Sequence, residues 1–174
     1  MAIEFKKIES QIIEGVWKIK PSIEKDNRGN IWTSYLEQEI KQLLNCDVNF
    51  IHDKFSMSKQ NVLRGIHGDL KTWKLVTCVY GEIYQVVVDC REKSHSFGKY
   101  DSFQINYQSP ISILIPPGLG NGYYVKSNLA VYHYKLAYDG EYFDAKDQFS
   151  YKWNDPMFNI TWPSNNPILS DRDK

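Results

Sequence analysis

The stretch KLVTCVYGEIYQVVVDC, residues 74–90, predicts two consecutive strands that meet at Gly81. Both halves are rich in β-branched and aromatic residues, which favour strands bounded by turn residues. Many short strands separated by turn signals, at spacings of roughly ten residues, are typical of an antiparallel sandwich or barrel and not of βαβ units. The sequence therefore predicts an all-β fold, with a jelly roll as its leading architecture. Further runs of this kind lie at 15–20, 30–35, 50–58, 100–106, 111–115, 122–127 and 130–137.

One helix is predicted, over TSYLEQEIKQLL at 33–44. Leu36, Ile40 and Leu43 fall at helical spacing, and Thr33 or Ser34 is expected to cap its start. A few short helices beside the strands are therefore expected.

No repeat or linker divides the chain, so its 174 residues predict a single domain over 1–174. The segment PPGLGNG at 116–122 is too short to separate domains and predicts a tight loop at the mouth of the barrel.

Charge and cysteine content exclude several classes of protein. The 21 Lys and Arg balance the 21 Asp and Glu, so the basic character expected of a nucleic-acid-binding protein is missing. No apolar run approaches the roughly 18 residues that cross a bilayer, and the N-terminus lacks the apolar core of a signal peptide. Three cysteines without CxxC spacing predict reduced thiols and a cytoplasmic protein.

His67 stands out in VLRGIHGDLKTWKLV, residues 62–76. Small jelly rolls often bind a metal through an HxH pair, but the position two residues after His67 is Asp69, and no other histidine lies two or four residues away. No metal site is therefore expected. Gly65 and Gly68 indicate a place where a ligand or another backbone approaches closely, which favours a functional histidine over one that only fills the core.

Strand alternation places His67 and Arg64 on opposite faces, so Arg64 is expected to serve another part of the site, as a phosphate contact or a solvated salt bridge. In AVYHYKLA, residues 130–137, Tyr132 and Tyr134 share one face. An inward tyrosine is either core packing or, in a polar pocket, a proton donor whose pKa a lysine lowers.

With these residues the sequence resembles the nucleotide-sugar 3,5-epimerases, the family of dTDP-4-dehydrorhamnose 3,5-epimerase. The resemblance covers nearly the whole chain and implies a cupin jelly-roll barrel, a homodimer with a site in each barrel, and neither metal nor organic cofactor. It rests on DNRG (26–29), VLRGIH (62–67), KLVTCVYGEIYQVVVD (74–89), IPPGLGNGYYV (115–125), YKW-DP (151–156) and ITWPSNNPILSDRD (160–173).

The resemblance also implies catalytic roles. His67 corresponds to the general base, Lys74 to the cation that stabilises the enolate, and Tyr134 to the general acid on the opposite side of the sugar. Asp173 is expected to orient His67, with Asp171 as the alternative. Inverting a carbon beside a ketone requires one base, one cation and one opposed acid, and these residue types supply them. The sequence ends just after this motif, which leaves a longer native tail open.

Arg28 and Arg64 correspond to arginines that contact the nucleotide diphosphate, and Arg28 is expected to serve the neighbouring subunit. Three departures from the family pattern bear on the substrate. Gly68 and Asp69 follow the base where the family has Tyr-Gln, which predicts extra space and an acceptor for a larger sugar. Asn121 replaces a second histidine, and Thr33 replaces a glutamate that contacts thymine.

These departures resemble a bacterial subgroup that acts on GDP-linked 4-keto-heptoses for capsular polysaccharide. The expected activity is epimerisation at C3 and also at C5 of a GDP-linked 4-keto-heptose or 4-keto-6-deoxy sugar, with a dTDP-linked substrate as the alternative. A C3-only epimerase, a cupin 3,4-ketoisomerase, a metal-dependent cupin enzyme and a non-catalytic sugar-nucleotide-binding cupin remain open.

Overall fold

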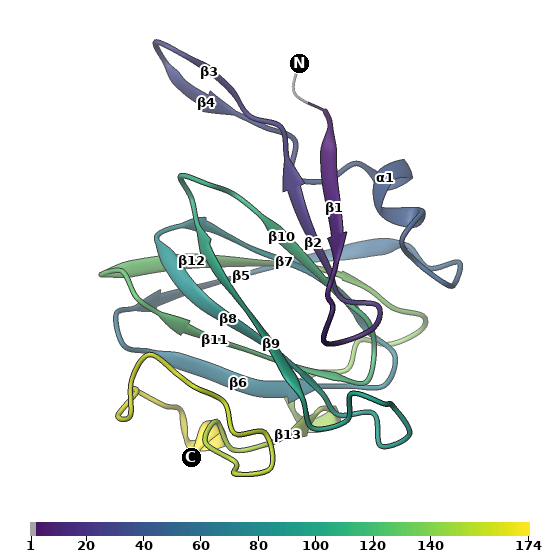
Figure 1. The fold of residues 1–174 in the computed structure, drawn as a ribbon, viewed down its shortest axis with the longest axis vertical. Coiled ribbons are helices and arrows are strands. Elements are labelled where there is room, and N and C mark those ends of the chain that lie inside the picture. Colours follow the sequence, from purple (N-terminus) through teal and green to yellow (C-terminus); the bar gives the residue numbers. More distant parts are fainter. Residues whose placement is uncertain (1–2) are drawn as a thin grey trace.

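The computed structural model describes residues 3–174, which form two antiparallel sheets packed face to face (Figure 1). The larger sheet has six strands in the order β1-β2-β10-β7-β12-β5, and the smaller has five in the order β13-β6-β11-β8-β9. A separate hairpin, β3-β4, projects from the top of the molecule. The prediction of an all-β jelly roll is confirmed.

The strands are β1 (Phe5–Glu9), β2 (Trp17–Pro21), β3 (Glu24–Asp26), β4 (Gly29–Ile31), β5 (Phe50–Lys59), β6 (Leu63–Gly68), β7 (Trp73–Tyr80), β8 (Glu82–Asp89), β9 (Tyr100–Asn106), β10 (Ser112–Ile115), β11 (Leu119–Val125), β12 (Leu129–Ala137) and β13 (Phe149–Ser150). The helices are α1 (Glu37–Lys41) and the 3₁₀ turns η1 (Ala145–Asp147) and η2 (Asp171–Asp173).

The two strands of residues 74–90 do not pair with each other, because β7 belongs to the larger sheet and β8 to the smaller. The chain passes from one sheet to the other at Gly81, whose φ of +83° is a conformation that side chains other than glycine rarely adopt. A Cβ at this position would also collide with the carbonyl oxygen of Leu129. Gly81 therefore forms the corner between the sheets.

Three clusters of buried side chains hold these layers together. The largest lies between the sheets and includes Val76, Val87 and Tyr132. The second packs Ile40 of α1 against the outer face of the larger sheet. The third packs Trp162 and other residues of the C-terminal segment against the outer face of the smaller sheet. This third cluster brings the end of the chain to β6, the strand that carries His67 (Figure 1).

Most predicted strands are present, but the regions before residue 50 and around 116–122 differ from expectation. Of the predicted run 30–35, only residues 30 and 31 lie in a strand, at the end of β4. The predicted helix is reduced to α1, which starts after Leu36 and has no side-chain cap, so the caps expected at Thr33 or Ser34 are wrong. The predicted loop PPGLGNG turns only at its start, and its Gly-Asn-Gly lies within β11. Strands β1, β3 and β13 were not predicted.

Across residues 3–174, the structure contains no helix with the length and apolar character that a membrane crossing requires. Cys46, Cys78 and Cys90 are all unpaired.

Candidate active site

A cavity of about 240 Å³ lies at the end of the barrel where the C-terminal segment meets the two sheets. It takes side chains from β5, β6, β7, β11 and β12 and from the segment after residue 141. Six of the residues predicted from the sequence are among those that line it. The full lining is Lys54, Ser56, Arg64, His67, Thr72, Lys74, Asn121, Tyr134, Leu136, Tyr142, Gln148, Ser170, Arg172 and Asp173.

Arg64 and His67 both face this cavity, although strict alternation would place them on opposite faces of β6. The register between β6 and β11 explains the difference: Tyr123 pairs with Arg64, and Asn121 pairs with His67. Three steps along β6 therefore match two along β11, which is a β-bulge. The expectation that Arg64 and His67 lie on opposite faces is wrong, because the bulge turns both side chains to the same side.

Gly65 permits the close approach of these two strands at the bulge. Its φ is +129°, and a Cβ at this position would come within 2.5 Å of the Cα of Gly122. The glycines that flank His67 thus accommodate neighbouring protein atoms. A Cβ at Gly68 would likewise collide with Phe149 and with the carbonyl oxygen of Leu119. Phe149 fills the space that was expected there for a larger sugar.

His67 is paired with Asp173, the last residue of η2. Its Nε2 lies 2.6 Å from Asp173 Oδ1, so the two groups form an ion pair when the imidazole is protonated. Ser170 Oγ donates to the other carboxylate oxygen at 2.7 Å. Burial alone would raise the pKa of the Asp173 carboxyl, but the bonds to His67 and Ser170 outweigh it and leave this pKa below its ordinary value.

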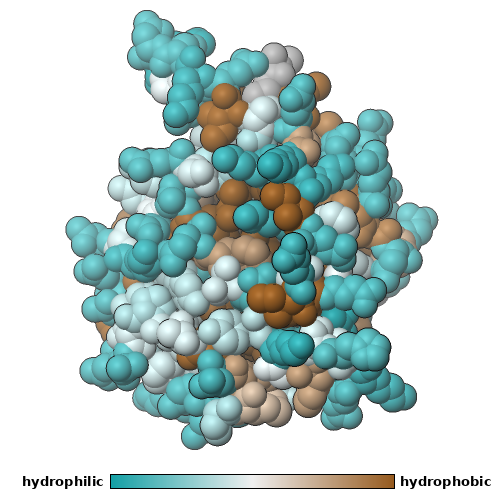
Figure 2. Space-filling model, in the orientation of Figure 1, coloured by the Kyte–Doolittle hydropathy of each residue, from teal (hydrophilic) through white to brown (hydrophobic). Residues whose placement is uncertain are grey.

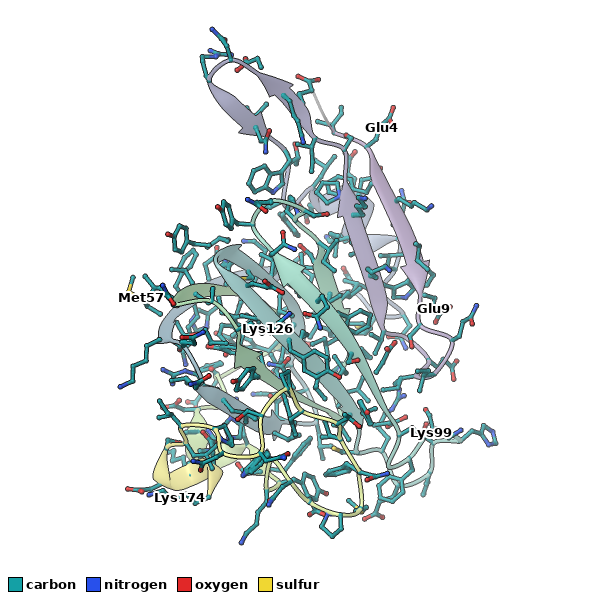
Figure 3. All side chains as sticks on the ribbon, turned by 60° about the vertical axis from the view of Figure 1, so that its left-hand side comes forward. Glu4, Glu9, Met57, Lys99, Lys126 and Lys174 are labelled. Atoms are coloured by element: carbon teal, nitrogen blue, oxygen red, sulfur yellow. The ribbon has the colours of Figure 1, made fainter. Side chains whose placement is uncertain are left out.

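Asp171, the alternative partner, points away from the site. Its side chain is 97% exposed and forms an ion pair with Lys174. Figure 3 shows the C-terminal segment in yellow, folded against the sheet with Lys174 at its outer side. The structure therefore places Asp173, and not Asp171, beside His67.

Lys74 is buried in the cavity wall, and its nearest carboxylate is Asp69 at 3.9 Å. Burial lowers the pKa of Lys74, and the charge of Asp69 opposes this shift. Asp69 does not line the cavity. Its Oδ1 accepts the backbone N–H groups of Lys71 at 3.0 Å and Thr72 at 2.6 Å, so it holds the turn after β6. Asp69 is therefore not positioned to contact a sugar, contrary to expectation. Instead it lies outside the cavity, where its charge acts on Lys74.

Tyr132 and Tyr134 share the inner face of β12, but only Tyr134 lines the cavity. Tyr132 is completely buried, and its hydroxyl donates to Gln85 Oε1 at 2.6 Å. Tyr134 lies next to Ser56, whose hydroxyl is 2.7 Å from that of Tyr123. Burial raises the pKa of Tyr134 above the ordinary value for tyrosine, and the hydrogen bond with Ser56 only partly offsets this. Tyr134 is therefore a neutral phenol that holds its proton at physiological pH.

Arg28 and Thr33, like Gly68 and Asp69, are predicted contacts that do not line the cavity. Arg28 is at the tip of the β3-β4 hairpin, where its side chain is 85% exposed and paired with Asp26 at 2.5 Å. The tip of this hairpin is almost entirely hydrophilic (Figure 2). Thr33 follows the hairpin and is also absent from the cavity lining. Within one chain, neither residue is positioned to contact a ligand that occupies the cavity.

Sequence reasoning missed several residues that line the cavity. Lys54 and Ser56 lie on β5, where alternation directs both to the same side, and Lys54 Nζ lies 3.5 Å from the hydroxyl of Tyr142. Arg172 lies between the two candidate aspartates, and Ser150 Oγ accepts a hydrogen bond from its Nε at 3.0 Å. Among these lining residues, only the two on β5 are indicated by the sequence, through the alternation of that strand. Alternation alone does not reveal which face of the strand is directed inward.

Among residues 3–174 no group of three or more His, Cys, Asp or Glu side chains could hold a metal ion. Thr72 Oγ1 is buried in the cavity wall and has no hydrogen-bond partner within the part of the chain that the structure describes. The cavity thus combines a carboxylate-paired histidine, a buried lysine and a neutral tyrosine.

Three comparisons relate this geometry to known proteins. The family model described as dTDP-4-dehydrorhamnose 3,5-epimerase matches residues 10–174. The enzyme of that name from Salmonella typhimurium is 34% identical over 165 residues, which cover 92% of this chain and 88% of that protein. A dTDP-4-dehydrorhamnose 3-epimerase from Streptomyces niveus is 32% identical over 165 residues, 93% of this chain and 78% of the relative.

The fold also matches solved structures. A dTDP-6-deoxy-D-glucose-3,5-epimerase from Legionella pneumophila, solved in complex with dTDP-4-keto-L-rhamnose, superposes with a TM-score of 0.89 at 32% identity. The match covers 98% of this chain and 90% of the Legionella chain.

Proposed function

Because the chain belongs to the dTDP-4-dehydrorhamnose 3,5-epimerase family of isomerases, we propose that it inverts carbons beside the C4 ketone of a nucleotide-linked 4-keto sugar without a cofactor. One observation carries this proposal. His67 on β6 and Tyr134 on β12 belong to different sheets and line one cavity together with Lys74. A base and an acid on opposed walls, with a cation in the same cavity, are what inversion through an enolate requires.

Each group has one step in this reaction. His67 removes the proton from the carbon next to the ketone, and the Asp173 carboxylate stabilises the imidazolium that forms. Lys74 stabilises the negative charge that develops on the ketone oxygen. Tyr134 then donates its phenolic proton to the opposite face of the carbon. This proton is available because burial raises the pKa of the phenol. Both C3 and C5 flank C4, so the same groups act at either carbon.

The diphosphate of the substrate is proposed to meet the cations at the cavity. Lys54, Arg64 and Arg172 all line it, and Arg64 is held in place by a hydrogen bond from its Nε to Ser58 Oγ at 3.0 Å. Guanidinium groups match the geometry of phosphate oxygens, which suits this assignment.

The identity of the nucleotide sugar is a narrower hypothesis. The relatives named above act on dTDP-linked sugars. A GDP-linked 4-keto-heptose for capsule or surface polysaccharide is proposed from the replacements at Thr33 and Asn121 and from the sequence resemblance. Comparing kcat/KM for dTDP-4-keto-L-rhamnose and a GDP-linked 4-keto-heptose tests it, and a preference for the dTDP sugar would overturn it.

The reaction itself is tested by incubating these 4-keto sugars with the protein in deuterium oxide. We expect label at C3 and at C5. His67→Asn and Tyr134→Phe are each expected to slow inversion by about 100-fold or more, the contribution typical of a general base or acid. Full exchange in both variants would contradict their assignment and favour a protein that only binds the sugar nucleotide.

Epimerisation at C3 alone is the second candidate, because a relative that is 32% identical over 165 residues is named a 3-epimerase. Label at C3 without label at C5 would establish it. A product whose carbonyl has moved to C3 would instead show a ketoisomerase.

A homodimer is also proposed, from an exposed apolar row on edge strand β5. Ile51, Phe55 and Met57 alternate along this strand and are 64%, 61% and 65% exposed. Figure 3 shows Met57 pointing away from the molecule. The exposed Arg28 would then contact the diphosphate bound by the partner, as the sequence resemblance implies.

Mixed dimers test this arrangement. Neither Arg28→Ala nor His67→Asn should support efficient turnover alone. Mixing the two should restore one site, which combines the intact His67 of one protomer with the intact Arg28 of the other. No recovery on mixing, or a monomer in sedimentation velocity at micromolar concentration, would contradict it.

A further inference from the structure

A buried amide network behind the cavity determines which atom Asn121 presents to a ligand. Asn121 lies on β11 directly opposite His67 on β6, and both line the cavity. Behind Asn121 lie Gln85 and Tyr132, both completely buried. The four atoms that connect these side chains fix the orientation of each amide group.

The network is anchored on a backbone carbonyl, which can only accept. Gln85 Nε2 donates to the carbonyl oxygen of Val86 at 2.9 Å, so the nitrogen of this amide must lie on that side. Gln85 Oε1 therefore faces Tyr132, whose hydroxyl donates to it at 2.6 Å. The second hydrogen of Gln85 Nε2 is directed to Asn121 at 2.6 Å. Exchanging nitrogen and oxygen in Gln85 would place two acceptors against each other at Val86.

The orientation of Asn121 follows from that of Gln85. Asn121 must present its oxygen to Gln85 Nε2, and the same oxygen lies 3.3 Å from the Tyr132 hydroxyl. Its amide nitrogen is then the polar atom left for the cavity. We infer that Asn121 is a fixed hydrogen-bond donor beside His67, which binds an oxygen of the sugar on or next to the carbon that His67 deprotonates.

This inference rests on the proposed function and makes it more specific. An amide cannot take or release a proton at physiological pH, so the wall beside the base recognises an oxygen and leaves proton transfer to His67 and Tyr134. Gln85 and Tyr132 are positioning residues, because they touch Asn121 and do not line the cavity. The substrate must therefore carry an acceptor, a ketone or hydroxyl oxygen, at this place.

Asn121→Asp tests the polarity of this contact with little change in shape. The aspartate still accepts the hydrogen from Gln85, so the buried network stays satisfied, and the melting temperature measures the cost of burying the added charge. Its second oxygen presents an acceptor to the cavity in place of a donor. We expect kcat/KM for deuterium wash-in from dTDP-4-keto-L-rhamnose or the GDP-linked 4-keto-heptose to fall by about 100-fold or more. Asn121→Ala, which only removes the donor, should cost about 10- to 100-fold.

Asn165→Asp is the matched control, because it makes the same change at an exposed position and should leave the rate unaltered. Wild-type rates in both Asn121 variants would overturn the inference. A large loss in Asn121→Ala with full activity in Asn121→Asp would also overturn it, since the site would then need only an acceptor.

A second measurement does not depend on turnover and separates this inference from the proposed function. In the ¹⁵N spectrum of the free protein, the side-chain amide protons of Gln85 should exchange slowly with water, and those of Asn121 should exchange rapidly. Slow exchange of the Asn121 protons would show that Asn121 is oriented the other way. If the wild-type protein exchanges no label from any 4-keto sugar, the proposed function fails, and this pattern still decides the orientation.

Discussion

Two basic side chains of this cavity each lie near a carboxylate, and the distance between the charged groups differs between the two pairs. Asp173 lies 2.6 Å from His67, whereas Asp69 lies 3.9 Å from Lys74. In the proposed reaction the closer pair serves a group that changes charge, because a histidine that takes a proton needs a partner for its imidazolium. In the same proposal the more distant pair serves a lysine that must stay protonated and donate its hydrogens to the substrate.

The two carboxylates are also positioned by different parts of the structure. Asp69 is two residues past His67 and is fixed locally, by the backbone of the turn that it holds. Asp173 comes from the far end of the chain, and the packing of the C-terminal segment on the smaller sheet brings it to β6. Removing either charge therefore changes one basic group while the barrel is preserved.

The largest effect is expected when the close pair is broken. Asp173→Asn keeps the shape of the side chain but removes the charge that stabilises the imidazolium of His67. We expect kcat/KM for the 4-keto sugar to fall by about 100-fold or more, with most of the loss in kcat. Stopped-flow or deuterium wash-in kinetics on the purified variant measure it.

Asp171→Asn is the matched control, because it removes the same charge two residues away at an exposed position. It should retain the wild-type rate. Equal losses in the two variants would show that the negative charge of the C-terminal segment acts at long range, and not through contact with His67.

Much of the fold could be predicted from the sequence because strands β5, β7–β10 and β12 are rich in β-branched and aromatic residues, which favour strands by themselves. The short strands of the N-terminal region carry little, since β3 and β4 are exposed and polar and form only a hairpin. The predicted helix there failed because only Ile40 of its apolar positions is completely buried, and one buried residue stabilises only a short helix.

The site was predictable in its residues and not in its arrangement. His67, Lys74 and Tyr134 line one cavity, as the sequence resemblance implies. Arg64 was misplaced because one extra residue in β6 reverses the alternation, and nothing in the sequence marks a bulge except a glycine. Asp173 was the expected partner of His67, but Asp171 remained an alternative because the turn of η2, which has no signal in the sequence, decides which one faces inward. Gln85 went unnoticed because its role depends on partners 36 and 47 residues away.

A smaller effect is expected at the distant pair, and it should depend on pH. Burial lowers the pKa of Lys74, and Asp69 opposes that shift. In the proposed reaction Lys74 stabilises the enolate only while it is protonated, so activity should decline as the pH rises through its lowered pKa. Asp69→Asn removes the opposing charge, lowers the pKa of Lys74 further and should move the alkaline limb of the kcat/KM profile to lower pH. Near neutral pH the loss should be only a few-fold.

Asp53→Asn is the control for this shift, because Asp53 pairs with Lys135 at 2.8 Å and Lys135 does not line the cavity. Its profile should match that of the wild-type protein. Asparagine at position 69 can still accept the N–H groups of Lys71 and Thr72, so the turn should survive and the melting temperature should separate loss of charge from loss of structure. An alkaline limb that does not move in Asp69→Asn would mean that another group, with Tyr134 as the first candidate, sets the upper pH limit of the reaction.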